Sequence, residues 1–371
     1  MKNNNLNSII FGTIFGLLAG VASTLLVSFY GADSLSNLNF NQEFNLNDYG
    51  YLSPNLVIRD PKKVVVNQDV KVDETIRDIK GSLLSVFVRL DNNDDYYDLN
   101  APFANAIAAT NDGWVMAIWP ETVPEYLLSK ASSTYVIIDS QKKIYEIDQV
   151  LFSTKNTGDF VFFHLLNANS LSVKRLLSDA EIKLGQSLIL STSNQAFVLD
   201  SLAKKNQDGL YLSSDIYAQK VSLANNDQET SAFIFNLNGD ILGVIDNKGN
   251  WLLSPAIDAY WRSLLRNNNL QKASLGVSYL DLSYIINNES APTKGALIQA
   301  VSGSNAIVKN SAAERAGLKL GDVITRINSI ELNSDNNLSL IISTYNPGDN
   351  IIIDFIRGGE SRQVEVVLGA I

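Results

Sequence analysis

Short strand-like segments that alternate with turns constrain the fold of this chain more than any other feature of its sequence. They run from Leu83 to Leu253, and the turns between them contain Asn, Asp and Gly. Examples are WVMAIW after the turn NDG, SAFIF and DILGVI on either side of NLNG, and the shorter LYLSS at residues 210–214. Many short segments rich in β-branched and aromatic residues at such intervals predict an all-β barrel or sandwich. We therefore expect a mainly β domain over this stretch, with LYLSS as one of its strands.

Composition limits the partners and the chemistry of the chain. Its 371 residues are 46% hydrophobic, which is enough for two or three folded domains. The formal net charge is −10 at pH 7 and no cluster of Lys or Arg interrupts it, so we expect no nucleic-acid partner. The chain has no cysteine, which excludes disulfide bonds, a thiol nucleophile and Cys-ligated zinc. Because His164 is the one histidine, we expect neither a transition metal nor another cofactor.

The uncharged segment from Ser8 to Tyr30 predicts a transmembrane helix. At about 1.5 Å per residue it is long enough to cross a hydrocarbon core of roughly 30 Å. Lys2 precedes it and Asp33 is the first charge after it, so the positive-inside tendency places the amino terminus in the cytoplasm. A cleaved signal peptide is the alternative, although its apolar region is usually shorter and ends at a small-residue cleavage site. We therefore expect contact with a lipid bilayer through residues 8–30.

Changes of pattern divide the chain into four parts. Residues 1–31 form the cytoplasmic tip and the anchor, and residues 32–72, rich in Asn, Asp and Ser, form an extracytoplasmic linker. The β-rich domain occupies residues 73–267 and ends with an amphipathic helix. Residues 268–371 form a second, smaller α+β domain.

A short helix, a glycine-stopped turn and a strand follow one another in SAAERAGLKLGDVITRINSIEL, within the last domain. Together with a Leu-Gly-Val loop at residues 275–277, this segment resembles the PDZ domains of bacterial periplasmic proteases. The resemblance implies a partly open β-barrel that binds an extended peptide as an added strand, while N–H groups of the loop receive the terminal carboxylate. The peptide-binding residues that it implies are Leu275, Gly276, Val277, Ser278 and Tyr279 at the sheet edge, and Leu338, Ile341 and Ile342 on the helix opposite. The alternative is that the apolar residues among them belong to the core alone.

A membrane anchor, a β-rich domain and a PDZ module in this order resemble the HtrA (Deg) family of membrane-anchored trypsin-like serine proteases. The resemblance implies a trypsin-like double β-barrel, a place in the bacterial cell membrane, a role in envelope protein quality control and assembly into a trimer. An enzyme of this class needs a hydroxyl nucleophile, a histidine base, a carboxylate that orients the histidine, and N–H donors for the oxyanion. Each of these groups can be sought in the sequence.

The catalytic positions that the resemblance implies are Pro120, Asp159 and Thr230, and two of the three have lost the required residue. GWVMAIW matches the approach to the family's histidine, but Pro120 stands where the histidine belongs. DFVFFH matches the strand that begins with the family's aspartate, which Asp159 retains. Alignment of NLNGDILGV puts Thr230 at the serine position, where its hydroxyl has no imidazole within reach. His164 lies five residues beyond Asp159 on a strand and faces the other way, so we expect a surface or half-exposed histidine.

The sequence therefore predicts a catalytically inactive, membrane-anchored HtrA-like pseudoprotease. It would bind exposed peptide segments or carboxyl termini through its PDZ domain, as a scaffold or regulator, in a homo-oligomer or in a hetero-oligomer with active proteases. Two alternatives stay open. One is an active serine-type endopeptidase with atypical catalytic residues, for example Ser231 with Lys220 as its base. The other is that residues 75–265 serve only as a spacer or an envelope-binding module.

Overall fold

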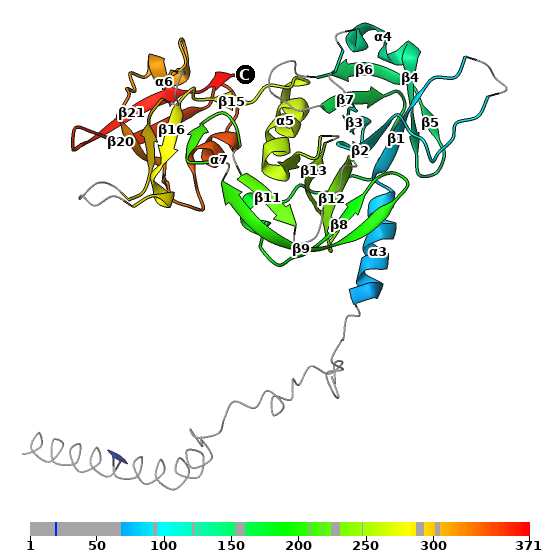
Figure 1. Ribbon diagram of the computed structural model, residues 1–371, viewed down its shortest axis with the longest axis horizontal. Helices are drawn as coiled ribbons and strands as arrows, with labels where there is room; N and C mark the ends of the chain where they lie inside the picture. Colours follow the sequence, from blue (N-terminus) through cyan, green and yellow to red (C-terminus); the bar gives the residue numbers. More distant parts are fainter. Residues whose placement is uncertain are drawn as a thin grey trace, which may run out of the picture. The chain divides into compact units, whose positions relative to one another are not determined.

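The computed structural model describes the chain from Gln68 to Ile371 with several gaps (Figure 1). The described residues are 19–20, 68–91, 95–120, 123–124, 126–152, 160–207, 209–217, 219–223, 231–246, 248–286, 293–300 and 305–371. Apart from residues 19–20, the expected membrane segment 8–30 lies outside them, as does most of the linker 32–72. Within the described ranges, no helix is both long enough and apolar enough to cross a membrane. The four domain boundaries stay predictions.

Seven antiparallel strands form the first sheet, in the order β5-β4-β1-β2-β3-β7-β6. Their bounds are β1 Leu83–Val88, β2 Ala104–Ala108, β3 Trp114–Ile118, β4 Tyr135–Asp139, β5 Ile144–Tyr145, β6 Ile147–Leu151 and β7 Phe160–Leu165. Successive side chains of a strand point to opposite faces, and every residue of β3 is buried, so both faces of the sheet are covered at this point. One covering layer is the helix α4 (Leu127–Thr134), whose Leu127 and Ala131 belong to the same apolar cluster as Phe163 of β7.

The second sheet has six strands in the order β11-β9-β8-β12-β13-β14. Their bounds are β8 Ser187–Ser191, β9 Ala196–Gln207, β11 Gln219–Leu223, β12 Ala232–Asn236, β13 Ile241–Ile245 and β14 Trp251–Leu253, and a 3₁₀ helix covers Asp179–Glu181. The turn NLNG joins β12 to β13: the side-chain oxygen of Asn236 accepts hydrogen bonds from the N–H groups of Asn238 and Asp240, and Gly239 has a φ of +80°. SAFIF and DILGVI are therefore paired neighbours, as their positions around the turn predict.

A shared apolar core joins the two sheets to the helices α3 (Gln68–Lys80) and α5 (Ser254–Asn267). Its members include Ile79, Met116, Phe160, Phe233, Val244, Trp261 and Leu264. Helix α5 begins with Pro255 in its first turn and ends at Asn268, which has a φ of 48°, a conformation that asparagine tolerates well. The prediction of a mainly β domain is confirmed.

The last part of the chain folds into a third sheet with short helices. The strands that this part contributes to the sheet are β16 Ser278–Asp281, β17 Ala296–Ile298, β18 Val323–Ile327, β19 Ile330–Glu331, β20 Asn350–Arg357 and β21 Glu360–Val367. Two short strands, β15 Ala273–Ser274 and β22 Gly369–Ala370, pair with each other in a separate sheet. The helices of this part are the 3₁₀ helix Leu282–Tyr284, α6 Ala312–Arg315 and α7 Leu338–Ser343. Side chains cap both α helices: Ser311 Oγ accepts the N–H of Glu314, and Asn337 Oδ1 accepts the N–H of Leu340. These caps explain why helices this short form where the sequence predicts them.

Strand β10 (Tyr211–Ser213) corrects one expectation. LYLSS does form a strand, but it does not join either sheet of the β-rich domain. It leaves the second sheet after β9, pairs with β16 at the edge of the third sheet, and returns as β11. Alternation of side chains shows that a segment is a strand without showing which sheet it joins, so the sequence pattern could not assign this pairing. The two parts of the chain belong to one compact unit, Val66–Ile371.

Candidate functional site

Pro120, which stands where the resemblance implies the catalytic histidine, lies two residues after the end of β3. Ile118 pairs with Phe160, the first residue of β7, so Pro120 and the start of β7 lie at the same end of the sheet. Asp159 and Thr230, the other two expected positions, lie outside the described residues. Because proline has no group that takes up a proton, the position that it occupies cannot supply a general base.

His164 lies at the other end of the same pair of strands. It pairs with Trp114, at the start of β3, and is four residues along β7 from Phe160. At about 3.3 Å per residue, this separates His164 from the expected catalytic end by roughly 13 Å. Its ring packs edge-on against Trp114 with centroids 5.1 Å apart, and 22% of its side chain is exposed. The prediction of a half-exposed histidine is confirmed.

Asp148 is the partner of His164, and sequence reasoning missed this pair. The distance from its Oδ1 to Nδ1 of His164 is 2.6 Å. Gln149, next to Asp148, lies opposite His164 in the β6–β7 pairing, where the register shifts. Such a shift changes which side chains meet across two strands, and the sequence carries no sign of it. The imidazole is therefore held by a carboxylate, at the end of β7 opposite to Pro120.

Near Ser231, one residue after the expected nucleophile, an amide side chain bridges the two sheets. Nδ2 of Asn105, in β2, donates to the carbonyl of Ser231 at 3.4 Å. Its Oδ1 accepts from both the N–H and the hydroxyl of Ser193, at 3.2 and 3.1 Å. An amide neither takes up nor releases a proton at neutral pH, so this arrangement positions the backbone without activating a hydroxyl.

The loop Leu275–Val277 precedes β16 and presents three successive backbone N–H groups. Gly276 at its centre has a φ of +82°, and a Cβ placed there would lie 2.3 Å from Cβ of Ser311. The loop is held from behind, because the N–H of Val308 donates to the carbonyl of Gly276 and that of Ala313 to the carbonyl of Leu275, both at 2.9 Å. Consecutive N–H groups in a turn of this kind form a concavity that binds anions. Only glycine fits its central position.

The eight expected peptide-binding residues come together between β16 and α7. Leu275, Gly276 and Val277 form the loop, Ser278 and Tyr279 begin β16, and Leu338, Ile341 and Ile342 lie on α7. Six of the eight belong to one apolar cluster, which places their side chains in the core as well as beside the sheet edge. Their role in peptide binding stays a prediction.

Chain segment 210–216, which sequence reasoning did not connect with this site, lies along the edge of β16. Leu212 pairs with Tyr279, and its side chain, 5% exposed, belongs to the same apolar cluster as the α7 residues. The carboxylate of Asp215 accepts the N–H groups of Leu275 at 2.9 Å and Gly276 at 3.1 Å. The loop that was expected to hold a terminal carboxylate therefore holds a side-chain carboxylate.

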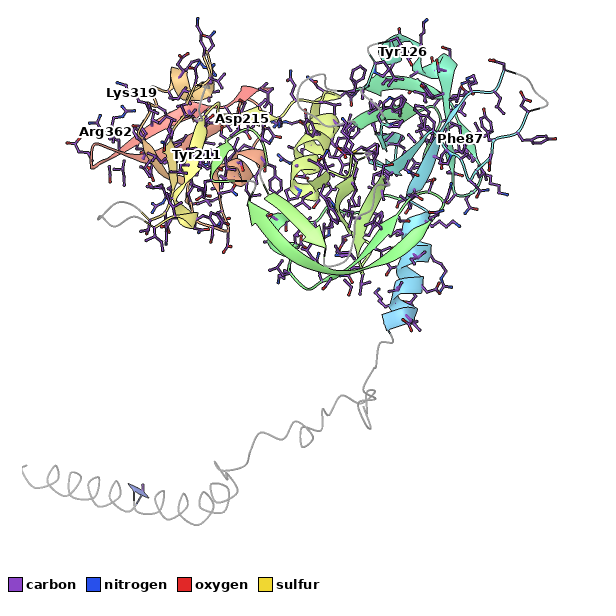
Figure 2. The ribbon with its side chains drawn as sticks, viewed as in Figure 1. Phe87, Tyr126, Tyr211, Asp215, Lys319 and Arg362 are labelled. Carbon is purple, nitrogen blue, oxygen red and sulfur yellow. The ribbon has the colours of Figure 1, made fainter. Side chains whose placement is uncertain are left out.

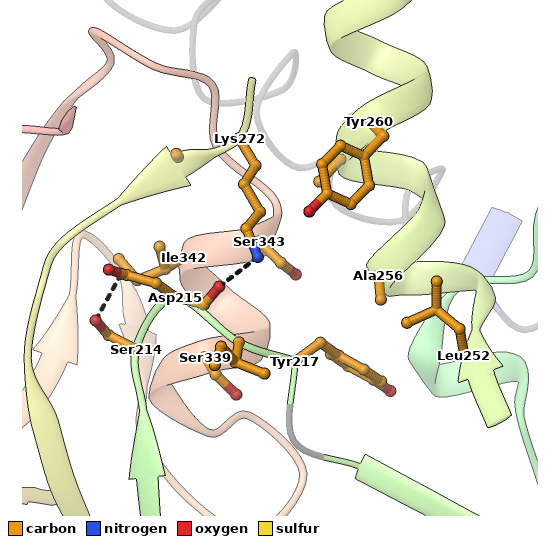
Figure 3. A pocket seen from close by; sticks show the side chains of 13 residues that line it. Ser214, Asp215, Tyr217, Leu252, Ala256, Tyr260, Lys272, Ser339, Ile342 and Ser343 are labelled. Atoms are coloured by element: carbon orange, nitrogen blue, oxygen red, sulfur yellow. Dashed lines mark hydrogen bonds between the residues drawn. The ribbon is translucent and has the colours of Figure 1, made fainter. Parts of the chain in front are cut away.

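A pocket of about 90 Å³ adjoins this segment, between α5 and α7 (Figure 3). Lys272 extends into it and donates to the backbone carbonyl of Asp215 at 2.7 Å. Burial lowers the pKa of the Lys272 amine, and the negative charge of Asp215 opposes this shift. On the facing helix, burial raises the pKa of Tyr260 to about 12. The cavity thus has a cationic side chain on one wall and a neutral phenol on the other.

Comparison with known proteins identifies the last part of the chain and shows relatives that match about half of it. Residues 273–368 match the PDZ domain family. The chain is 24% identical over 172 residues to the serine protease Do-like HtrA of Lactococcus lactis subsp. lactis, covering 42% of each chain. It is 23% identical over 242 residues to the periplasmic pH-dependent serine endoprotease DegQ of Escherichia coli, covering 60% of this chain and 51% of that one.

A solved structure, the HtrA-type protease AlgW with a decapeptide, aligns with 81% of this chain and 98% of its own, at 14% identity and a TM-score of 0.49. The chain spans about half the length of the curated relatives that it matches. Its fold is mainly β, with two sheets followed by the PDZ domain. The chain therefore carries a PDZ domain over residues 273–368, and about half of its length is similar to serine proteases of the HtrA (Deg) type.

Proposed function

We propose that this chain is a membrane-anchored, extracytoplasmic pseudoprotease that recognises carboxyl termini or exposed peptide segments through its PDZ domain. It acts as a scaffold or regulator in envelope protein quality control, in a homo-oligomer or with active proteases of its own family. The main support for the absence of catalysis is the position of His164. The features that support peptide recognition are the loop Leu275–Val277 and the edge of β16.

A general base has to reach the proton that it removes, at about 2.6–3.2 Å or through one water molecule. His164 is tied to Asp148 at one end of β7, while the expected catalytic position, Pro120, adjoins the opposite end. A separation of roughly 13 Å along the strand cannot be closed by rotation of a side chain. Without a base, a serine or threonine hydroxyl keeps its ordinary, very weak nucleophilicity.

Peptide recognition rests on backbone groups of the PDZ domain, which bind the main chain of a peptide whatever its side chains are. The N–H groups of Leu275, Gly276 and Val277, which now donate to side chains of segment 210–216, would receive the carboxylate of a peptide. The edge of β16, which now pairs with β10, would receive the peptide as an added strand. The apolar side chains of α7 lie next to this edge. An extended peptide with a free carboxyl terminus is the ligand whose chemistry fits all three.

Hydrolysis of an unfolded protein tests the inactive state. Purified full-length chain is incubated with β-casein at several pH values, beside a T230A/S231A double variant, a His164→Ala variant and Escherichia coli DegQ as the active control. We expect cleavage by DegQ alone. Cleavage by the unaltered chain that disappears in T230A/S231A would refute the proposal and establish an enzyme with an unusual base. Loss of cleavage in His164→Ala would identify that base.

The membrane anchor is proposed from the uncharged segment 8–30 and is tested separately. The full chain and a version without residues 1–31 are expressed, and their membranes are washed with alkaline carbonate. We expect the full chain to stay in the membrane pellet and the truncated chain to be released. Release of both would contradict an integral anchor.

A further inference from the structure

Segment 210–216 lies in the PDZ groove as a peptide ligand would lie. It is antiparallel to β16, with Tyr211 opposite Leu280, Leu212 opposite Tyr279 and Ser213 opposite Ser278. Figure 2 labels Tyr211 and Asp215, near the two ends of the segment. The N–H of Ser214 donates to the carbonyl of Val277 at 2.9 Å and extends the ladder to the start of the loop. This is strand addition to a sheet edge, made by a segment of the same chain.

The anion-binding loop is filled by two side chains of the segment. Oδ1 of Asp215 accepts the N–H groups of Leu275 and Gly276, and Oγ of Ser214 accepts the N–H of Val277 at 3.1 Å. All three loop donors therefore have a partner. The carboxylate is held further by the hydroxyls of Ser214 on Oδ1 and Ser274 on Oδ2, both at 2.7 Å. Asp215 thus supplies the negative charge that a carboxyl terminus would bring.

The apolar part of the groove is occupied as well. Leu212 is the member of the segment whose side chain enters the cluster formed by Tyr279 and the α7 residues Leu338, Ile341 and Ile342. Ser213 and Tyr211, its neighbours along the strand, alternate to the other face and are more exposed. Three elements of peptide recognition, namely the sheet edge, the anion loop and the apolar contact, are therefore used at once.

We propose that residues 211–215 are an internal ligand of the PDZ domain, which closes the groove until an external peptide displaces them. The displacing peptide is extended and ends in a free carboxylate. Its last residue takes the place of Ser214, and an apolar residue two positions earlier takes the place of Leu212. The part of this inference that concerns external peptides rests on the proposed function, whereas the internal contact does not.

An external peptide loses affinity because the segment that it has to displace belongs to the same chain as the groove. The segment is part of the loop between β9 and β11, and short flexible linkers give effective concentrations in the millimolar range. If the segment itself binds the open groove with a Kd on the order of 10 μM, the closed groove binds an external peptide about 100-fold more weakly than the open groove does. Removing the carboxylate of Asp215 relieves much of this competition. We expect the Asp215→Ala variant to bind such a peptide at least about tenfold more tightly than the unaltered chain.

The binding assay uses a fluorescein-labelled peptide with the sequence of residues 207–214, QDGLYLSS, with a free terminal carboxylate. Anisotropy titrations compare the full chain, Asp215→Ala, and Asp335→Ala, which removes the same charge from an exposed PDZ position outside the groove. The same peptide with an amidated end is the ligand control. We expect tighter binding in Asp215→Ala alone, and little binding of the amide by any of the proteins.

A disulfide trap tests the internal contact without any external peptide. Ser278 donates its N–H to Ala306 and accepts at its carbonyl from Gln299, so it faces Ser213 as a pair without backbone hydrogen bonds, the closer of the two kinds of antiparallel pair. The natural chain has no cysteine, so S213C/S278C introduces the only two thiols. S213C/S361C is the control, because Ser361 lies on β21 at the far edge of the same sheet.

The two assays separate the inferences. The internal ligand predicts rapid intramolecular oxidation of S213C/S278C and not of S213C/S361C, and loss of peptide binding in the oxidised protein that reductant restores. A trapped disulfide without peptide binding by any protein, Asp215→Ala included, upholds the internal contact and refutes external recognition. No disulfide, together with equal peptide binding by the unaltered chain and Asp215→Ala, overturns the internal ligand and leaves the proposed function standing.

Discussion

Replacement of Gly276 by alanine should lower the stability of the PDZ domain more than the replacement by alanine of a glycine in an open turn. The added Cβ would meet Cβ of Ser311 at 2.3 Å, whereas carbon atoms are best separated by about 3.5–4.0 Å, so one of the two segments has to move by more than about 1 Å. The left-handed backbone alone costs an alanine about 1–2 kcal/mol. Displacement of Ser311, whose hydroxyl caps α6, adds about 1 kcal/mol. The expected loss of stability is therefore about 2–3 kcal/mol.

Gly317→Ala is the matched control for this prediction. Gly317 has a φ of +76°, close to the +82° of Gly276, but nothing lies within 4 Å of its added Cβ. It should therefore lose only the conformational part, about 1–2 kcal/mol. The difference between the two variants isolates the close approach of the loop to Ser311.

Amide hydrogen exchange of β18 measures the loss, because this strand lies in the core of the PDZ sheet and exchanges through opening of the domain. The tryptophans Trp114, Trp119, Trp251 and Trp261 all lie outside the PDZ domain, so their fluorescence follows the rest of the chain and should be unchanged. Equal destabilisation by Gly276→Ala and Gly317→Ala would refute the argument from close approach.

Three further predictions follow from the packing and charges. Phe163→Ala, at a fully buried position, should cost about 3–5 kcal/mol in urea unfolding followed by tryptophan fluorescence, whereas Tyr96→Ala, at a 92% exposed one, should cost under ~0.5 kcal/mol. Hydrogen bonds from Ser178, followed by Arg175, lower the pKa of Glu181 to about 2. Its stabilisation is therefore present above about pH 4.5 and lost as the pH falls to about 2, and solvent screening keeps it below ~1 kcal/mol. The melting temperatures of Glu181→Gln and the unaltered chain should accordingly differ at pH 6 and converge near pH 2. Lys272→Met removes the hydrogen bond to the carbonyl of Asp215 and should tighten binding of the QDGLYLSS peptide, and unchanged affinity would separate Lys272 from the closed state.

Local signals made the PDZ domain predictable. Ser311 caps the start of α6, and Gly317 follows the end of the same helix. Both signals lie within a few residues of the helix, so they can be recognised in a single sequence. The same holds for the NLNG turn between β12 and β13. Gly276 was singled out by the resemblance of Leu275–Val277 to a PDZ loop, and its φ of +82° is a conformation that favours glycine.

Long-range pairings were not predictable in this way. The strand pattern of LYLSS was correct, but its partner β16 lies far along the chain, and period-two alternation fits any sheet edge with a buried face. The contact between His164 and Asp148 depends on a register shift between β6 and β7. Asp215 had no signal at all, since an aspartate after two serines is a common turn pattern. In each case the sequence did not show which distant residue or strand the segment would contact.

The unpredicted segment changes how the proposed function has to work. If the chain is inactive, as proposed from the place of its histidine at the other end of β7, it has no turnover that a PDZ ligand could switch on. A peptide that enters the groove can therefore act only by changing what the chain binds. Its entry frees residues 211–215, and with them the side chain of Leu212, which is otherwise buried. Because the segment continues directly into β9 and β11, the freed residues stay attached to the second sheet. The consequence of peptide binding is then a new apolar surface beside the β-rich domain, which is the kind of change that a scaffold can pass to a partner.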